Sequence, residues 1–149
     1  VQVTYPNFDD EKEIITRMTG GAAIKTKEIL SAQAILKAQN IVDGIFVSEH
    51  LKDYIVHLVS ATRKPKDYHL EKLTPLIEYG ASPRASIGLT VAAKAHAFLN
   101  GRGYATPEDV KALAPDVMRH RLILTYEAEA QNLKGDDLIA QILQKVPVP

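Results

Sequence analysis

The hydrophobic positions of this chain recur mostly with the spacing of an amphipathic α-helix. The clearest example lies at 49–63, where apolar side chains fall at i, i+3, i+4, i+7 and i+8. These side chains are Leu51, Tyr54, Ile55, Leu58 and Val59. Ser48, immediately before this helix, is a favourable N-cap. The pattern predicts an all-α helical bundle of about five or six helices.

Capping residues and glycines set the bounds expected for the other helices. Asn7 can cap a helix over 8–18, and Gly20 can end it. A second helix is expected over 26–42, although Ser31 is an equally good cap and would start the helix later. The remaining helices are expected over 83–100, from Pro107 to Pro115 or soon after, and over 136–145.

Three segments depart from the helical spacing. The segment VQVTYP at 1–6 alternates apolar and polar residues, which predicts a short N-terminal strand without a partner strand. The segment 64–81 contains two prolines and no sustained period, so we expect a long loop with at most one short turn. The alternation at 122–126 fits either a short extended piece or one turn of helix.

The helix expected over 83–100 carries an apolar stripe with small residues beside it. Gly88 and Ala92 are the small residues, and they would let a neighbouring helix approach closely. The stripe itself consists of Ile87, Val91, Ala95 and Phe98.

Composition narrows the class of protein. The chain has 149 residues, about the length of one domain, and its 18 basic and 18 acidic residues cancel. Neutral charge argues against a nucleic-acid or membrane-surface binder, which would show a basic excess. The absence of cysteine excludes disulfides, zinc ribbons and thiol catalysis. The sequence has no apolar run of membrane-spanning length and no signal peptide, so a cytoplasmic location is expected.

Most catalytic signatures are absent from the sequence. It contains no phosphate-binding P-loop motif, no zinc-protease motif and no nucleophile elbow. The five histidines are scattered, and His50 and His57 lie two helical turns apart, too far to share a metal ion through short side chains. We therefore expect no metal site.

One arginine occupies an unusual position. Ser82 is placed as a helix N-cap and Pro83 as the first helical residue, which puts Arg84 in the first turn. The positive end of the helix dipole disfavours a cation there by about 0.3–1 kcal/mol. An arginine beside free backbone N–H groups is, however, well placed to bind phosphate. The residues alone leave two interpretations open, a phosphate contact and an ordinary solvent-facing arginine.

Three other arginines are weaker candidates for an anion site. Arg63 is expected at a helix C-terminus, where a cation is favourable, so a structural role explains it equally well. The other two flank His120 and can equally form a solvated cluster paired with Asp116 or Glu127. The three candidates are Arg63, Arg119 and Arg121.

Several motifs together resemble one protein family. The segment YGASPRASIGLTVAAKAHAFLNGRGYATPEDVKALAPDVMRHRLILTYEAEA at 79–130 resembles the C-terminal lid of MoxR-type AAA+ ATPases. The stretches SEHLKDYIVHLVSATR and YPNFDDEKEII also resemble segments of that family. In the family, the GASPRA motif carries the sensor-2 arginine, and Arg84 occupies that position here. The resemblance extends over nearly the whole chain.

The resemblance implies that the chain is a piece of a longer enzyme. Residues 1–6 would be a remnant of the sheet of an ATPase core, and residues 7–149 would be the helical lid domain. The parent enzyme would bind ATP and Mg²⁺ through Walker motifs that this chain lacks, so the chain alone would be inactive. The implied partners are the missing core domain, the other subunits of a hexameric ring and an unknown client protein that is assembled or activated in a chaperone-like manner. No membrane or nucleic-acid partner is expected.

The resemblance also implies roles for individual residues. Arg84 would contact the γ-phosphate of ATP in its own or a neighbouring subunit, with Ser82 and Pro83 in the same nucleotide-binding turn. The secondary candidates for nucleotide or inter-subunit contacts are again Arg63, Arg119 and Arg121. A rival interpretation is a helical adaptor or protein-interaction domain without ATPase ancestry, since a missing P-loop fits that class equally well.

Overall fold

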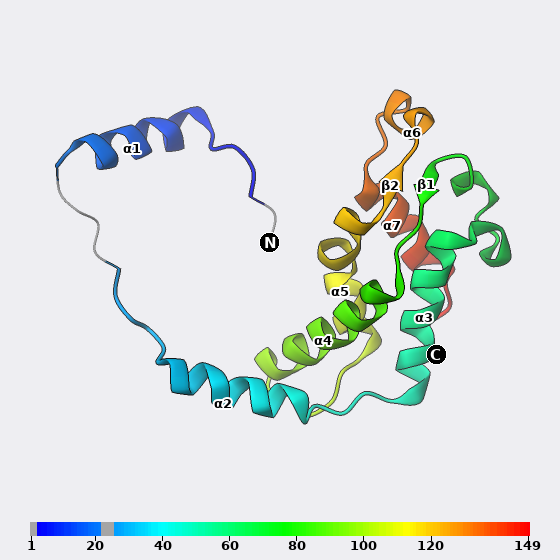
Figure 1. The fold of residues 1–149 in the computed structure, drawn as a ribbon, viewed down its shortest axis with the longest axis horizontal. Coiled ribbons are helices and arrows are strands. Elements are labelled where there is room, and N and C mark those ends of the chain that lie inside the picture. The colour runs from blue at the N-terminus through cyan, green and yellow to red at the C-terminus, as the bar shows by residue number, and fades with distance from the viewer. Residues whose placement is uncertain (1–2, 22–25) are drawn as a thin grey trace. The chain divides into compact units, whose positions relative to one another are not determined.

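The structure, a computed structural model, describes residues 3–21 and 26–149 (Figure 1). It divides into two compact units, Val1–Leu36 and Lys37–Pro149, which are described separately. Within the described residues there are seven α-helices, three short 3₁₀ helices and one two-stranded sheet. The protein is therefore mostly helical, as the hydrophobic spacing predicted.

The first unit contains helix α1, Phe8–Thr19, close to the expected 8–18. The side-chain oxygen of Asn7 accepts a hydrogen bond of 2.9 Å from the N–H of Asp10, and three acidic residues occupy the first turn. Helix α2 covers Ala32–Asp43. Ser31 Oγ accepts from the N–H of Ala34 at 3.2 Å, so the later of the two expected starting points is correct and the start at residue 26 is wrong.

The predicted N-terminal strand is wrong for the residues that the structure describes. Residues 3–6 form no strand, and Val1 and Gln2 lie outside the described residues. A strand needs a hydrogen-bonded neighbour, and no described segment pairs with 3–6. The small sheet lies mid-chain instead, where β1 (Ile77–Tyr79) pairs antiparallel with β2 (Ile123–Leu124).

Four helices enclose the core of the second unit (Figure 1). Helix α4 packs on α3 and α5, and α7 packs on α5 and α3. Every apolar position that predicted the helix at 49–63 is buried in the structure. The bounds of these helices are Glu49–Arg63 for α3, Pro83–Leu99 for α4, Pro107–Met118 for α5 and Gly135–Lys145 for α7.

Helix α4 buries a different face from the apolar stripe seen in the sequence. Ile87 and Val91 are 65% and 57% exposed, whereas a row of small residues and one leucine faces the core. The small side chains let α4 approach α5 closely, and a methyl group added at Gly88 would lie 3.1 Å from the Val117 side chain. The expected close helix approach is thus confirmed. The buried residues of α4 are Ala85, Leu89, Ala93 and Ala97.

The segment 64–81 is more ordered than the expected loop. It contains two 3₁₀ helices, η1 (Pro65–Tyr68) and η2 (Glu71–Leu73), followed by β1. The apolar residues of this segment follow the spacing of neither a helix nor a strand, yet five of them are buried and anchor the segment to the core. These residues are Pro65, Leu70, Leu73, Leu76 and Ala81.

The C-terminal part of the chain combines short elements. Helix α5 continues past Pro115 to Met118 and is followed by the 3₁₀ helix η3, Arg119–Arg121. The alternation at 122–126 gives both of its expected outcomes, because β2 is followed directly by the short helix α6, Tyr126–Ala130. No helix in the described parts of the chain is long and apolar enough to cross a membrane.

Candidate functional site

The N-terminus of α4 has the geometry that the sequence predicted. Ser82 is the N-cap, with extended backbone angles of −79° and 169°, and Pro83 is the first helical residue. The carbonyl of Ser82 accepts a hydrogen bond of 2.8 Å from the N–H of Ala85, but its hydroxyl makes no capping hydrogen bond. No side chain of the described residues therefore caps the start of α4, which leaves this end of the helix suited to an anion.

Arg84 lies in this first turn and is exposed. No carboxylate among the described residues lies within 4.0 Å of its guanidinium group. The ion pairs within the second unit are all formed by charged side chains other than Arg84. A cation at the positive end of a helix dipole is disfavoured unless an anion offsets it. Because the described residues supply none, the arrangement fits an anion from outside this domain.

Two residues immediately before the cap lie in close contact with the end of α3. The N–H of Ala81 donates to Thr62 Oγ1 at 2.9 Å, and that hydroxyl donates to the carbonyl of Val59 at 2.7 Å. Thr62 is only 1% exposed. A methyl group added at Gly80 would lie 2.5 Å from the carbonyl oxygen of Thr62, so only glycine fits at this position. These contacts fix the chain just ahead of Arg84.

Arg63 ends α3 beside this turn and is exposed. One of its terminal nitrogens donates to Ser60 Oγ at 3.2 Å, and its side-chain stem lies next to Gly80. With Ser60, Lys64 and two residues of η1, Arg63 lines an open pocket of about 420 Å³. Of the three weaker candidates, Arg63 is therefore the one that the structure places next to the chain leading into Arg84.

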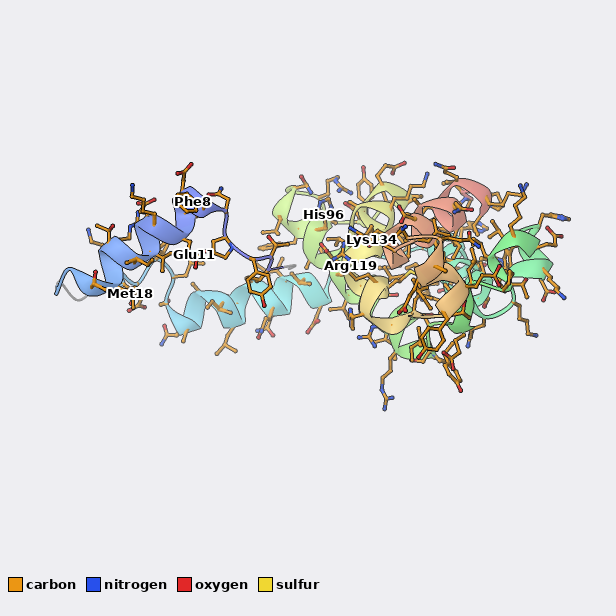
Figure 2. The ribbon with its side chains drawn as sticks, turned by 90° about the horizontal axis from the view of Figure 1, so that it is seen from above. Phe8, Glu11, Met18, His96, Arg119 and Lys134 are labelled. Atoms are coloured by element: carbon orange, nitrogen blue, oxygen red, sulfur yellow. The ribbon has the colours of Figure 1, made fainter. Side chains whose placement is uncertain are left out.

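Arg119 and Arg121 are used inside the domain. Arg119, which is labelled in Figure 2, donates from Nε to Asp136 Oδ1 at 2.9 Å and from a terminal nitrogen to Asp116 Oδ1 at 2.6 Å. Arg119 thereby ties η3 to both α5 and α7, and the pairing with Asp116 that the sequence offered is present. Arg121 Nε donates to the carbonyl of Val117 at 3.0 Å. No contact brings either arginine to Arg84 within the described residues.

A buried carboxylate network holds the far end of α4 to the start of α5. Asp109 is 1% exposed, and its Oδ2 accepts from the N–H of Thr106 and from a terminal nitrogen of Arg102, each at 2.8 Å. His96 Nδ1 lies 2.6 Å from Asp109 Oδ1 and must carry a proton there, since an ionised carboxylate only accepts. Thr106 and Asp109 form a capping box at the start of α5, and the contacts of Asp109 with Arg102 and His96 tie that box to the end of α4.

The electrostatics of this network favour the ionised form of Asp109. Burial alone would raise the pKa of the carboxyl, but the hydrogen bonds from Arg102, His96 and Thr106 outweigh burial and hold the pKa well below its usual range. Asp109 therefore stays ionised near neutral pH and stabilises the junction of α4 and α5. Among the described residues, no group of three His, Asp or Glu side chains is placed to hold a metal ion.

The low pKa of Asp109 predicts how stability depends on acid. The pKa of aspartate in the unfolded chain is about 3.9, which is above the pKa of Asp109 in the folded protein. The network therefore contributes its full stability above about pH 3.9, and this stability is lost as the pH falls below that value. In Asp109→Asn the free energy of unfolding should fall less steeply than in wild type between about pH 5 and pH 3. Urea unfolding at each pH measures this. Parallel pH curves for the two proteins would contradict the assignment.

Comparison with known proteins identifies the class of this domain. Residues 73–142, which run from the end of η2 into α7, match the family model described as the AAA lid domain. This part of the second unit is therefore an AAA lid.

Relatives extend the relationship to the whole chain. The chaperone MoxR1 of Mycobacterium tuberculosis is 42% identical over 149 residues, which are 100% of this chain and 39% of the relative. Protein MoxR of Methylorubrum extorquens is 33% identical over 97% of this chain and 42% of its own length. A crystal structure of a putative ATPase from Cytophaga hutchinsonii superposes with a TM-score of 0.85 at 40% identity and covers 100% of this chain and 46% of that one. The chain is therefore homologous to the MoxR proteins over its full length and carries an AAA lid domain.

Two consequences follow from these matches. The chain spans about two fifths of the length of the curated relatives described above. The relationship to AAA lids also rules out the rival interpretation of a helical adaptor without ATPase ancestry.

Proposed function

We propose that this chain is the lid of a MoxR-type ATPase and that Arg84 is its sensor-2 arginine, which contacts the γ-phosphate of bound ATP. The observation that carries the proposal is the exposed guanidinium in the first turn of α4, with no carboxylate partner among the described residues. An arginine and a helix N-terminus together offer charge-assisted hydrogen bonds to phosphate.

The residues present fit one end of the nucleotide only. Arg84 and the turn formed by Ser82 and Pro83 can meet phosphate oxygens, but the described residues offer no cluster that would hold Mg²⁺. We therefore assign the Mg²⁺ ligands and most of the ATP contacts to a core domain outside this chain. When bound there, ATP and Mg²⁺ would supply the phosphoryl-transfer chemistry.

Arg84 would act by stabilising charge on the γ-phosphate. Negative charge is redistributed over the phosphate oxygens as the bond to the leaving group breaks, and a positioned guanidinium stabilises that arrangement. Release of phosphate removes the contact, so the lid can then rotate against the core. Arg84 can serve its own subunit or a neighbour in this scheme. Arg63 is a secondary candidate for the same anion.

The proposal also includes the proteins with which this lid would work. The partners would be the AAA core domain, other subunits of a hexameric ring and a client protein whose assembly or activation consumes ATP. One relative of the chain is named a chaperone, which supports a chaperone-like role, and we place that role in the cytoplasm as part of the same proposal.

The 149-residue chain by itself should release no phosphate from ATP. One arginine and one helix end bind phosphate weakly and cannot activate a water molecule without the core. A phosphate-release assay with ATP and Mg²⁺ measures this, with circular dichroism confirming that the chain is helical under the same conditions. The full-length protein serves as the positive control. Turnover by the isolated chain above the buffer blank would contradict the proposed division between lid and core.

A further inference from the structure

A single buried hydroxyl joins α3 to the turn that leads into α4. Thr62 Oγ1 donates to the carbonyl of Val59 at 2.7 Å and accepts from the N–H of Ala81 at 2.9 Å. Thr62 and Ala81 are 1% and 0% exposed, so water cannot replace either bond readily. We call this pair of hydrogen bonds the Thr62 bridge. It connects positions 19 residues apart in the chain.

The backbone next to the Thr62 bridge has no room to shift toward α3. A methyl group at Gly80 would lie 2.5 Å from the carbonyl oxygen of Thr62, 2.6 Å from its carbonyl carbon and 2.8 Å from Arg63 Cγ. Two of these three atoms belong to the backbone and cannot rotate away as a side chain can. Gly80 and the Thr62 bridge therefore hold the same short segment against α3.

This segment leads directly into the proposed sensor-2 position. Only Ser82 and Pro83 separate Ala81 from Arg84, and the proline ring fixes one of the intervening backbone angles. Ala85, one residue after Arg84, is fully buried and fixes the other side of the turn. A displacement at Ala81 would thus be carried into the first turn of α4, where Arg84 lies.

We propose that Thr62 is a positioning residue for Arg84: its hydroxyl sets the place of the arginine relative to α3, and Gly80 permits the close approach that this requires. The inference rests on the proposed function of Arg84. Transition-state contacts are sensitive to placement, and a shift of about 1 Å can cost on the order of 10²-fold in rate. Loss of the Thr62 bridge should therefore slow ATP hydrolysis although Thr62 itself is buried and touches no nucleotide.

The test is a double-mutant cycle in the full-length protein. Thr62→Val removes the hydroxyl at nearly constant volume and should lower kcat for ATP by about tenfold or more. Thr62→Ser keeps the hydroxyl and should stay close to wild type. In an Arg84→Ala background, Thr62→Val should have little further effect, because the residue that it positions is already gone.

A matched control and a second variant complete the design. Thr90 Oγ1 donates to the carbonyl of Ser86 within α4, so Thr90→Val removes a similar hydroxyl without breaking a tie between elements, and it should leave kcat unchanged. Gly80→Ala should lower kcat as Thr62→Val does and should also lose its effect in Arg84→Ala. Circular dichroism and melting temperature establish that each variant is folded at the assay temperature.

The outcomes separate the two proposals. If Arg84→Ala lowers kcat but Thr62→Val does not, or if the two effects multiply in the double variant, the positioning role is wrong and sensor 2 stands. If Arg84→Ala has no effect, the proposed function fails first. If both Thr62→Val and Gly80→Ala abolish folding, Thr62 is a structural residue and the positioning role is overturned.

Discussion

Replacing Asp109 by alanine should destabilise the second unit by about 3 kcal/mol, the lower end of the cost of breaking a buried ion pair. The substitution removes the cap that the Asp109 side chain gives to the N–H of Thr106 and leaves Arg102 and His96 without their anion. The side chains of Arg102 and His96 are 28% and 36% exposed, so water offsets part of the loss. Urea unfolding followed by circular dichroism measures the change.

Asp136→Ala is the matched control for this prediction. Asp136 also pairs with an arginine, but its side chain is 45% exposed, and such pairs are worth about 1 kcal/mol or less. Asp109→Ala should lose clearly more stability than Asp136→Ala. Equal losses would mean that the Asp109 network contributes no more than a surface pair.

Replacing Arg84 by alanine in the full-length protein should lower kcat for ATP by about 10²-fold, the usual loss when one charge-stabilising donor is removed. Stability should change little, because Arg84 is exposed and forms no ion pair with the described residues. Arg84→Lys keeps the charge but not the two-pronged geometry, so partial activity is expected. Steady-state phosphate release gives kcat and KM for each variant.

Lys72→Ala is the control for loss of a surface cation. Lys72 is exposed, belongs to η2 and takes part in no ion pair among the described residues. Its removal should leave kcat and KM unchanged. If Arg84→Ala behaves like Lys72→Ala, Arg84 is an ordinary surface residue.

The helices of this protein could be predicted because their signals are local. The bounds of α3 follow from Ser48 and the apolar spacing after it, and the start of α5 follows from the capping box of Thr106 and Asp109. The small sheet could not be predicted, because Ile77 pairs with Leu124 and nothing in either short segment specifies so distant a partner.

The sequence also did not indicate which face of α4 is buried, because that depends on how α4 packs on another helix. Large apolar side chains at Ile87 and Val91 dominate the sequence pattern, yet the structure buries alanines because they allow close packing on α5. Hydrophobicity alone does not register that preference, since a small side chain contributes little area but permits a short distance between helices.

In the candidate site, too, a residue with a local signal could be predicted from the sequence, and a residue that depends on distant contacts could not. Arg84 was visible in the sequence because a cation in the first turn conflicts with the helix dipole, and a local conflict is a signal of function. Thr62 gave no such signal, since its importance depends on contacts with Gly80 and Ala81 across the fold. Arg119 was a weaker candidate in the sequence, with Asp116 as one possible partner, and the structure shows that it pairs with both Asp116 and Asp136.

A structure of the full-length protein with Mg²⁺ and a non-hydrolysable ATP analogue would show whether Arg84 contacts the γ-phosphate. We expect a guanidinium nitrogen of Arg84 at hydrogen-bond distance, about 2.7–3.2 Å, from a γ-phosphate oxygen in its own or a neighbouring subunit. A nucleotide-bound structure in which Arg84 faces solvent in every subunit would contradict this expectation.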